Sequence, residues 1–245
     1  FGSVLYPIID NKICILDETY RKNDRPFVNA PMFSELFDQI IHYEQNLEGV
    51  QKIFLGSAGS FNYGHWVTDD FPRLEAAYYL REIYPDHHIQ IILNSFHPHL
   101  DKIKEEGIMI YLNKMDNFSI KFVSNNIIFN IKNIHYVTPV GFHPIVKYPE
   151  ALNKLNYRIN SSISKNKSRL LFVSRQPPDT RCLINHREID SVLSLLGFDT
   201  MVIDKQSFEE QVEAFASADI IVGCMGAAMS NIVFSKKKTQ IIMLA

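Results

Sequence analysis

The sequence predicts an α/β protein whose C-terminal half is built around a parallel, doubly wound sheet. From residue 149 onward, short apolar segments alternate strictly with amphipathic segments, the pattern of parallel strands that are connected through helices. A chain of 245 residues can form one large domain or two small ones. The pattern changes after the Gly-Phe-His-Pro segment at 141–144, a stretch typical of a linker. We therefore expect two domains, over residues 1–144 and 145–245.

The first domain is predicted to be rich in strands. Its first part is irregular, with β-like runs at 4–9 and 12–16 and a helix-like apolar spacing over 33–44. A buried strand follows at 51–60 and ends in small residues. Thr68, Asp69 and Asp70 mark the start of a helix over 68–84, because capping and acidic residues are favoured in a first turn. The later elements are a strand at 88–94, a short helix at 101–106, and strands at 107–113, 118–123 and 126–139.

The second domain is predicted to alternate between helices and strands. Helices are expected at 149–162, 187–196, 207–216 and 226–233, and strands at 168–175, 198–204, 219–223 and 239–244. In such a sheet, ligands bind outside the carboxyl ends of the strands. The last strand has nothing after it to cover it and the chain begins without Met, so we expect a fragment of a longer protein.

Composition excludes several classes of protein. With 46% hydrophobic and 21% charged residues, the chain is globular rather than collagenous, disordered or disulfide-stapled. Its 25 basic and 27 acidic side chains leave no excess of positive charge, so nucleic acid is not an expected partner. Cys14, Cys182 and Cys224 have no paired or metal-type spacing, which favours the reducing cytoplasm. No apolar run predicts a signal peptide or transmembrane segment, and peripheral association with the inner face of the membrane stays open.

A first polar cluster follows the predicted strand at 168–175. Arg175 ends this strand, and Arg181, Asn185 and Glu188 lie in the following loop and at the next helix start. Two guanidinium groups in one strand-end loop can clamp a diphosphate, because each binds oxyanions in a bidentate fork. Alternatively, they form exposed salt bridges with Asp179 and Glu188, worth at most ~1 kcal/mol each. Spacing alone does not choose between these interpretations.

A second cluster is the small-residue turn between the predicted strand 219–223 and the following helix. Small residues let backbone N–H groups approach a phosphate at a helix start. Alternatively, Gly226, Ala227 and Ala228 only permit tight packing of the helix on the sheet. The three-glycine dinucleotide fingerprint is absent, so the sequence does not favour a nicotinamide enzyme.

A third cluster lies between the strand at 51–60 and the next helix. His65, Asp69 and Arg73 recur every four residues, so a helical turn would place them on one face. His65 could then be a general base that Asp69 orients. Alternatively, Asp69 and Asp70 are N-terminal charges of the helix and His65 is a turn residue, which spacing alone favours.

Taken in chain order, with the third cluster first, then the first and then the second, these clusters resemble the landmarks of glycosyltransferase family 61, the DUF563-type sugar transferases, from about Gly56 to Leu244. The His-Trp, Asp and Pro-Arg-Leu landmark is matched by His65, Trp66, Asp69, Pro72, Arg73 and Leu74. The Ser-Arg landmark with its following Arg, Asn and Glu is matched by Ser174, Arg175, Arg181, Asn185 and Glu188. The Gly-Pro-His-Gly-Ala-Gly landmark with its polar pair is matched by Gly223, Gly226, Ala227, Ser230 and Asn231.

The resemblance implies two Rossmann-like halves that face a cleft, an arrangement of the GT-B type. It also implies an inverting transfer from a nucleotide-sugar donor to a glycan or lipid-linked saccharide acceptor, with no bound metal and no cofactor. The N-terminal domain would then serve the acceptor and the C-terminal domain the donor. Similar bacterial transferases assemble capsule or lipopolysaccharide, so surface polysaccharide synthesis is the expected pathway.

The resemblance also suggests roles for the matching residues. We expect His65 to be the catalytic base with Asp69 orienting it, Asp69 as direct base being the alternative, and Asn62 and Arg73 to support them. Arg73, one turn after Asp69, is expected to hold that carboxylate ionised. The expected donor-binding residues are Arg175, Arg181, Asn185, Glu188, Gly226, Ala227, Ala228, Ser230 and Asn231.

Two alternatives remain open. Cys224, Met225 and Ala228 stand where the family usually has Pro, His and Gly, so a catalytically inactive sugar-nucleotide-binding module is one of them. The other is a metal-dependent hydrolase, because His97 and His99 have the His-x-His spacing of a metal site. No matching set of ligands is recognisable at later strand ends.

Overall fold

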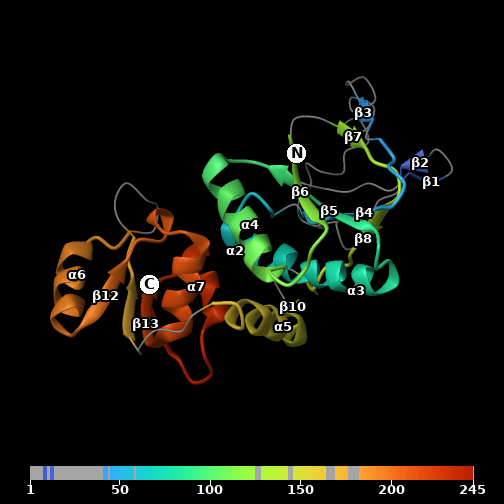
Figure 1. Ribbon diagram of the computed structural model, residues 1–245. Helices are drawn as coiled ribbons and strands as arrows, with labels where there is room; N and C mark the ends of the chain where they lie inside the picture. Colours follow the sequence, from blue (N-terminus) through green and yellow to red (C-terminus); the bar gives the residue numbers. More distant parts are fainter. Residues whose placement is uncertain are drawn as a thin grey trace. The chain divides into compact units, whose positions relative to one another are not determined.

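The chain divides into two compact units, each containing a four-stranded parallel sheet (Figure 1). The computed structural model describes residues 8–9, 12–13, 41–43, 45–57, 59–124, 128–142, 146–163, 169–175 and 182–244. By their contacts, Phe1–Asp101 and Lys114–Tyr148 form the first unit, and Lys102–Asn113 and Pro149–Ala245 form the second. The predicted α/β class and the parallel C-terminal sheet are confirmed, and both sheets are consistent with Rossmann-like halves. Separate donor and acceptor roles for residues 1–144 and 145–245 stay a prediction.

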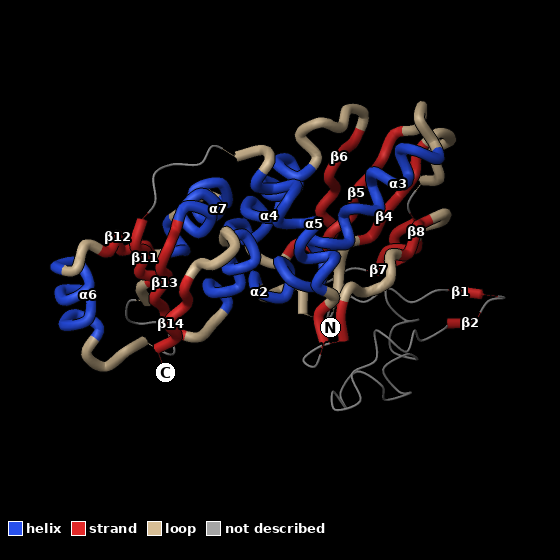
Figure 2. Tube along the Cα trace, turned by 90° about the horizontal axis from the view of Figure 1, so that it is seen from below, coloured by secondary structure: helices blue, strands red, loops and turns tan. Residues whose placement is uncertain are grey.

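The sheet of the first unit has the strand order β6-β5-β4-β8 (Figure 2). Its strands are β4 (Val50–Phe54), β5 (His88–Ser95), β6 (Phe118–Ser124) and β8 (Ile134–Tyr136). The chain extends the sheet from β4 to one side and then returns to place β8 on the other side. The direction of winding therefore reverses between β4 and β8, and ligands bind at such switch points in doubly wound sheets.

Small pairs of strands accompany this sheet. They are β1 (Ile8–Ile9) with β2 (Lys12–Ile13), β3 (Ile41–Tyr43) with β7 (Ile128–Asn130), and β9 (Gly141–Phe142) with β10 (Val146–Lys147). The helix predicted over 33–44 is wrong at its end, because 41–43 is a strand that pairs in parallel with β7. A partner strand distant in sequence decides the state of such a short segment. Residues 33–40 and 44 lie outside the described residues.

The helical segment after β4 begins earlier than predicted and changes its winding. It consists of α2 (Tyr63–His65), the π-helical turn η3 (Trp66–Asp70), the 3₁₀ turn η4 (Phe71–Leu74) and α3 (Glu75–Ile83). Asn62, rather than Thr68, caps its start. Trp66 is fully buried and stacks on Phe71 at 4.6 Å between ring centroids, which anchors the π-helical turn in the core. Figure 2 shows α3 running along β4 and β5.

Helix α4 (Pro98–Tyr111) replaces the short helix and the strand predicted over 101–106 and 107–113. Its buried positions, among them Ile103, Gly107 and Tyr111, recur at helical rather than alternating spacing. The Glu106 carboxylate accepts a hydrogen bond from the Phe208 backbone N–H at 2.8 Å, at the start of another helix of the second unit. Tertiary packing therefore overrides the strand-like composition of the apolar run.

The sheet of the second unit has the order β12-β11-β13-β14. Its strands are β11 (Arg169–Val173), β12 (Phe198–Met201), β13 (Ala218–Cys224) and β14 (Gln240–Leu244). The other elements are α5 (Pro149–Asn160), α6 (His186–Leu195), η5 (Ile203–Lys205), α7 (Phe208–Ser217) and η6 (Ala227–Phe234). Helices α6 and α7 lie on opposite faces of the sheet (Figure 1), so the winding reverses between β11 and β13.

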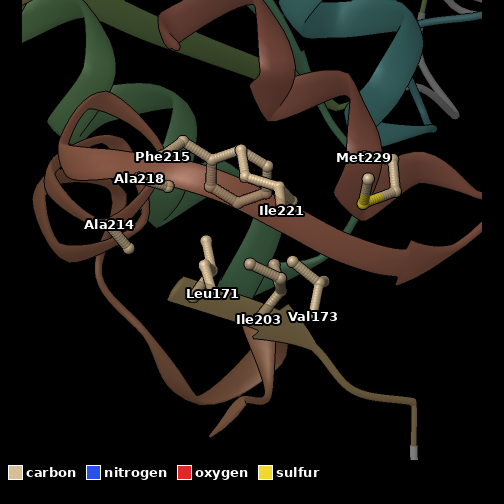
Figure 3. Packing of buried hydrophobic residues seen from close by; sticks show 8 residues of the cluster. All are labelled: Leu171, Val173, Ile203, Ala214, Phe215, Ala218, Ile221 and Met229. Atoms are coloured by element: carbon tan, nitrogen blue, oxygen red, sulfur yellow. The ribbon is translucent and has the colours of Figure 1, made fainter. Parts of the chain in front are cut away.

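Buried side chains join α7 and η6 to this sheet (Figure 3). The cluster consists of Leu171, Val173, Ile203, Ala214, Phe215, Ala218, Ile221 and Met229. Met229 reaches it because Gly223 has no side chain: a Cβ there would lie 2.6 Å from the Met229 sulfur. The helix predicted over 226–233 exists, but it is a 3₁₀ helix.

A histidine network lies at the beginning of the first unit's sheet. The Gln51 amide nitrogen donates to His87 Nδ1 at 2.8 Å, and its oxygen accepts from His135 Nε2 at 2.6 Å. Tyr84 lies beside both imidazole rings. Burial lowers the pKa of His135 below its usual value, because the charged ring would lose solvation.

This network predicts that mild acid destabilises the protein through His135. Since its pKa is lower in the folded state, the unfolded chain binds more protons as the pH falls through about 6.5. The His135 contribution to the free energy of unfolding is therefore complete above about pH 7.5 and is lost toward the lowered pKa. In urea unfolding between pH 8 and pH 5, His135→Gln should show a weaker loss of stability on acidification than the wild type. Substitution of the exposed His99 by Gln is the control, and equal pH slopes in all three proteins would contradict the prediction.

Candidate functional site

The predicted site residues form two groups, one in each unit. His65, Asp69 and Arg73 belong to the helical segment that follows β4 in the first unit. Arg175 and Gly226 follow β11 and β13 in the second unit. Each group therefore lies at the carboxyl ends of parallel strands, next to the point where the winding of its sheet reverses.

The position of His65 is set by the helix start and by a glycine. The Asn62 Oδ1 accepts hydrogen bonds from the backbone N–H groups of Gly64 at 2.9 Å and His65 at 3.4 Å. This cap begins the helix and so places His65 in its first turn. Gly59, in the loop before it, lies against the imidazole: a Cβ there would be 2.7 Å from His65 Cγ.

His65 and Asp69 form the pair that their spacing predicts. His65 Nδ1 lies 2.9 Å from Asp69 Oδ2, and the side chains are 23% and 14% exposed. Because a carboxylate only accepts hydrogen bonds, Nδ1 carries the proton and the lone pair is on Nε2. The other carboxylate oxygen, Oδ1, contacts the Lys147 ammonium and lies 3.3 Å from the Thr68 hydroxyl. The pair thus has the tautomer that a histidine base requires, and both oxygens of Asp69 are engaged.

Arg73 pairs with Asp70, whereas the sequence predicted a pair with Asp69. Its Nη1 lies 3.5 Å from Asp70 Oδ1, and both side chains are buried. The same guanidinium donates to the carbonyl oxygens of Gly56, at 3.1 Å, and Val137. These carbonyls belong to the loops after β4 and β8, so Arg73 ties together the two strand ends at the switch point.

Asp70 also orders the loop before the helix. Its Oδ2 accepts from the Ser60 hydroxyl at 2.6 Å, and the Ser60 oxygen accepts from the Ser57 backbone N–H at 2.7 Å. Ser60 and Asp70 are both buried. A buried carboxylate therefore connects the small-residue loop to the helix that carries His65.

In the second unit, Arg175 lies directly against Gly226. A Cβ on Gly226 would be 2.5 Å from Arg175 Nη2 and 2.9 Å from its Cζ. Ser174, the preceding residue, is buried, and its hydroxyl has no hydrogen-bond partner among the residues described here. A guanidinium and an unsatisfied hydroxyl thus lie at the switch point between β11 and β13, a combination suited to an oxyanion.

Cys224 and Met225 are the two residues that stand in place of the Pro and His of the third landmark that the sequence resembles. Burial raises the pKa of the Cys224 thiol, the Arg175 charge opposes this rise, and the Cys182 thiol adds to it. The Cys182 thiol donates to the Arg175 carbonyl oxygen at 3.2 Å. Met225 is 62% exposed, so its thioether faces solvent.

The loop that was expected to complete the clamp is only partly described. Arg181 and Asp179 lie outside the described residues. Asn185 and Glu188 are exposed, and the Asn185 amide donates to Glu188 Oε2 at 3.4 Å. Both interpretations of this loop, as a diphosphate clamp or as a set of exposed salt bridges, therefore stay open.

The η6 residues divide into accessible and buried positions. Ala227, Ala228 and Ser230 are half-buried, and Ala228 packs on the core. Asn231 is fully buried and donates to Gln211 Oε1 at 3.0 Å. Its side chain therefore fastens η6 to α7, and any effect of Asn231 on a ligand passes through the position of η6.

The family assignment follows from a match over both groups. A family model described as Glycosyltransferase 61 matches residues 63–242, from the first residue of α2 into β14. The chain belongs to glycosyltransferase family 61. It is therefore a sugar-transferring enzyme that uses a donor and an acceptor. A comparison with curated proteins gave no significant match.

Two residues that contact the His65–Asp69 pair of this glycosyltransferase were not predicted from the sequence. Lys147 contacts Asp69 although it lies far along the chain in β10, and no local pattern marks it. Gly59 could have been found in the run of small residues at 56–60, but its contact with His65 required the structure.

The metal-hydrolase alternative gains no support. His97 and His99 are exposed, and His97 Nδ1 accepts from the His99 backbone N–H at 3.3 Å. Within the described ranges, no group of three or more His, Cys, Asp or Glu side chains could hold a metal ion. No described helix is both long and apolar enough to cross a bilayer.

The contact between Gly59 and His65 predicts that Gly59→Ala disturbs the imidazole. The added methyl group would overlap the ring, and overpacking of this kind costs about 1–3 kcal/mol in the free energy of unfolding. Urea unfolding of the wild type, Gly59→Ala, His65→Ala and the double variant measures the coupling. We expect the alanine at 59 to cost at least about 1 kcal/mol less when His65 is already alanine. Additive changes would show that the two residues do not act on each other.

Proposed function

We propose that this family 61 enzyme is an inverting GT-B transferase with His65 as its catalytic base. It moves a sugar from a nucleotide-sugar to a hydroxyl group of a glycan or lipid-linked saccharide, without a bound metal or cofactor. It works in the cytoplasm, at the inner face of the membrane, in the synthesis of a surface polysaccharide such as capsule or lipopolysaccharide. The observation that carries the proposal is the His65–Asp69 hydrogen bond, which leaves the imidazole lone pair on Nε2.

The reaction needs a proton acceptor. In an inverting transfer, the acceptor oxygen attacks the anomeric carbon from the face opposite the phosphate. The new carbon–oxygen bond forms as the bond to phosphate breaks, and the electron pair of the broken bond goes to the nucleoside phosphate. A hydroxyl group becomes a sufficient nucleophile when a base accepts its proton during the attack. His65 Nε2 accepts it in our proposal, and Asp69 stabilises the imidazolium that forms.

His65 is a better base than Asp69 in this setting. An unperturbed imidazole has a pKa of about 6.5, which suits proton transfer at neutral pH, whereas an aspartate has one of about 3.9. Both Asp69 oxygens already accept contacts, Oδ2 from His65 and Oδ1 from Lys147. Asp69 therefore orients the base.

The donor is assigned to the Arg175 group of the second unit. Arg175 would bind the phosphates and stabilise the negative charge that develops on the leaving group. The open space at Gly226 lets the guanidinium lie beside the backbone, and the Ser174 hydroxyl supplies a further donor. Arg181, Asn185, Glu188, Ala227, Ala228 and Ser230 complete the proposed donor site.

A second candidate function is binding of a sugar nucleotide without turnover. Met225 favours it, because an exposed thioether stands where the family usually has His and cannot donate a hydrogen bond to a phosphate. The two functions share the donor site and differ in whether product forms.

The donor assignment predicts that a nucleotide sugar stabilises the protein in the presence of EDTA and that Arg175→Lys weakens this effect. A ligand that binds only the folded state raises the melting temperature. Lysine keeps the charge but loses the bidentate fork, so we expect an affinity about 10-fold to 1000-fold lower. A thermal-shift titration with UDP-, GDP-, ADP- and CMP-sugars measures both.

Arg187→Lys is the matched control, because Arg187 is exposed on α6 and should keep the wild-type shift. Equal nucleotide affinity in Arg175→Lys and the control would exclude Arg175 from the phosphate site. A shift that needs a divalent metal and no nucleotide would instead support the hydrolase.

The base assignment predicts that His65→Ala abolishes turnover while donor binding persists. Loss of a general base costs about 100- to 10,000-fold in rate, and Asp69→Asn should cost less because the imidazole remains. Release of the nucleotide from the stabilising donor, with a panel of saccharide acceptors, measures turnover. His99→Ala, a change at an exposed histidine, should be inert.

The opposite ranking, with Asp69→Asn inactive and His65→Ala active, would make Asp69 the base. Normal turnover in both variants would mean that the base lies elsewhere. Donor binding with no product from the wild type would favour the inactive module.

A further inference from the structure

We propose that Lys147 is a positioning residue of the reaction, whose ammonium group holds Asp69 in place and keeps His65 uncharged before the acceptor binds. This inference deepens the proposed function, because its catalytic meaning rests on His65 being the base. Its physical content, an electrostatic link from Lys147 to His65, does not need that assumption.

The β9–β10 pair brings Lys147 to the helical segment. Lys147 lies opposite Gly141 in this antiparallel pair, and the Tyr148 backbone N–H bonds the Val140 carbonyl at 3.0 Å beyond it. A Cβ on Gly141 would lie 2.7 Å from the Val146 carbonyl oxygen and 3.0 Å from Lys147 Cδ. The absence of a side chain at position 141 therefore leaves room for the lysine stem to extend to Asp69.

The Asp69 carboxylate lies between two nitrogen groups. Oδ1 contacts Lys147 Nζ, and Oδ2 contacts His65 Nδ1. Because Oδ2 is bonded to His65, and Oδ1 contacts Lys147 and accepts from the Thr68 hydroxyl, the plane of the carboxylate is fixed, and so is the imidazole bonded to it. Lys147 therefore acts on the base through Asp69, and it need not touch a substrate.

The charges around His65 make the effect electrostatic as well as geometric. Asp69 faces it from the same helical segment, and Lys147 approaches from β10. Asp70, also on this segment, is neutralised by Arg73 and bonded to Ser60. Gly59, on the loop side of the ring, carries no charge.

A protonated His65 would place a second positive charge beside the Lys147–Asp69 pair. Lys147 and Asp69 are 27% and 14% exposed, so solvent screens this repulsion only in part. Without Lys147, the unbalanced carboxylate would hold a proton on His65 more tightly. The lysine thus keeps the Nε2 lone pair available at neutral pH.

The experiment is an NMR titration of the His65 ring in the ligand-free protein. The ring signal is assigned by its loss in His65→Gln. We expect the His65 titration midpoint to rise by about 0.5–1 pH unit in Lys147→Met, because a nearby positive charge is removed. Lys147→Arg keeps the charge and should restore the wild-type midpoint, and Lys132→Met, at an exposed lysine of the same unit, should not change it.

An unchanged or lowered midpoint in Lys147→Met would overturn the proposal, since a merely structural ion pair would not move the titration in this direction. If Lys147→Met does not fold, Lys147→Gln replaces it. Asp69→Asn should lower the midpoint, because Lys147 would then act without its counterion, and a rise would also contradict the proposal.

Activity separates this inference from the proposed function. Once a donor is known, the acid limb of the pH profile of kcat/KM should move in Lys147→Met as the midpoint does. If the midpoint moves but His65→Ala keeps its turnover, the electrostatic link stands and the base assignment fails.

Discussion

The first unit's site depends on the contacts of one buried group, the guanidinium of Arg73. It donates hydrogen bonds to the carbonyl oxygens of Gly56 and Val137, so it connects the loops that follow β4 and β8 at the switch point of the sheet. A buried charge requires a partner, and Asp70 supplies it from the same helical segment. Asp70 in turn bonds Ser60 in the loop before the helix. One buried ion pair therefore holds both loops against the helical segment to which His65 belongs.

The strands of the second unit's sheet were predictable because their apolar runs and connecting helices alternate along the chain. Helix α4 was not, since its second half has the composition of a strand, and contacts such as Glu106 with the start of α7 are invisible in a local pattern. Strand β3 is the converse case, because the apolar spacing over 33–44 predicted a helix and residues 41–43 instead pair with β7. In both places a partner distant in sequence decided the structure, so propensity could not.

The candidate site shows the same limit at the level of single side chains. The His65–Asp69 pair follows from a spacing of four residues, which helical geometry brings together. Arg73 lies four residues after Asp69 and three after Asp70, and both spacings allow contact. The segment 66–70 is a π-helical turn, which is wider than an α-helical one, and Arg73 faces Asp70. Lys147 comes from a separate strand pair and could be found only by folding the chain.

The two groups of site residues differ in the charges that surround their central side chains, His65 and Arg175. These charges suit the different roles that we propose for the two residues, as a base and as a phosphate ligand. Around His65, the Asp69 carboxylate contacts both the imidazole and the Lys147 ammonium, so a negative and a positive charge lie beside the ring. Around Arg175, the neighbouring thiol of Cys224 has a raised pKa because it is buried, and it therefore stays neutral near pH 7. A thiolate there would repel an anionic ligand and compete for the guanidinium. The neutral thiol adds no negative charge beside Arg175, which is compatible with the phosphate binding that we propose for this residue.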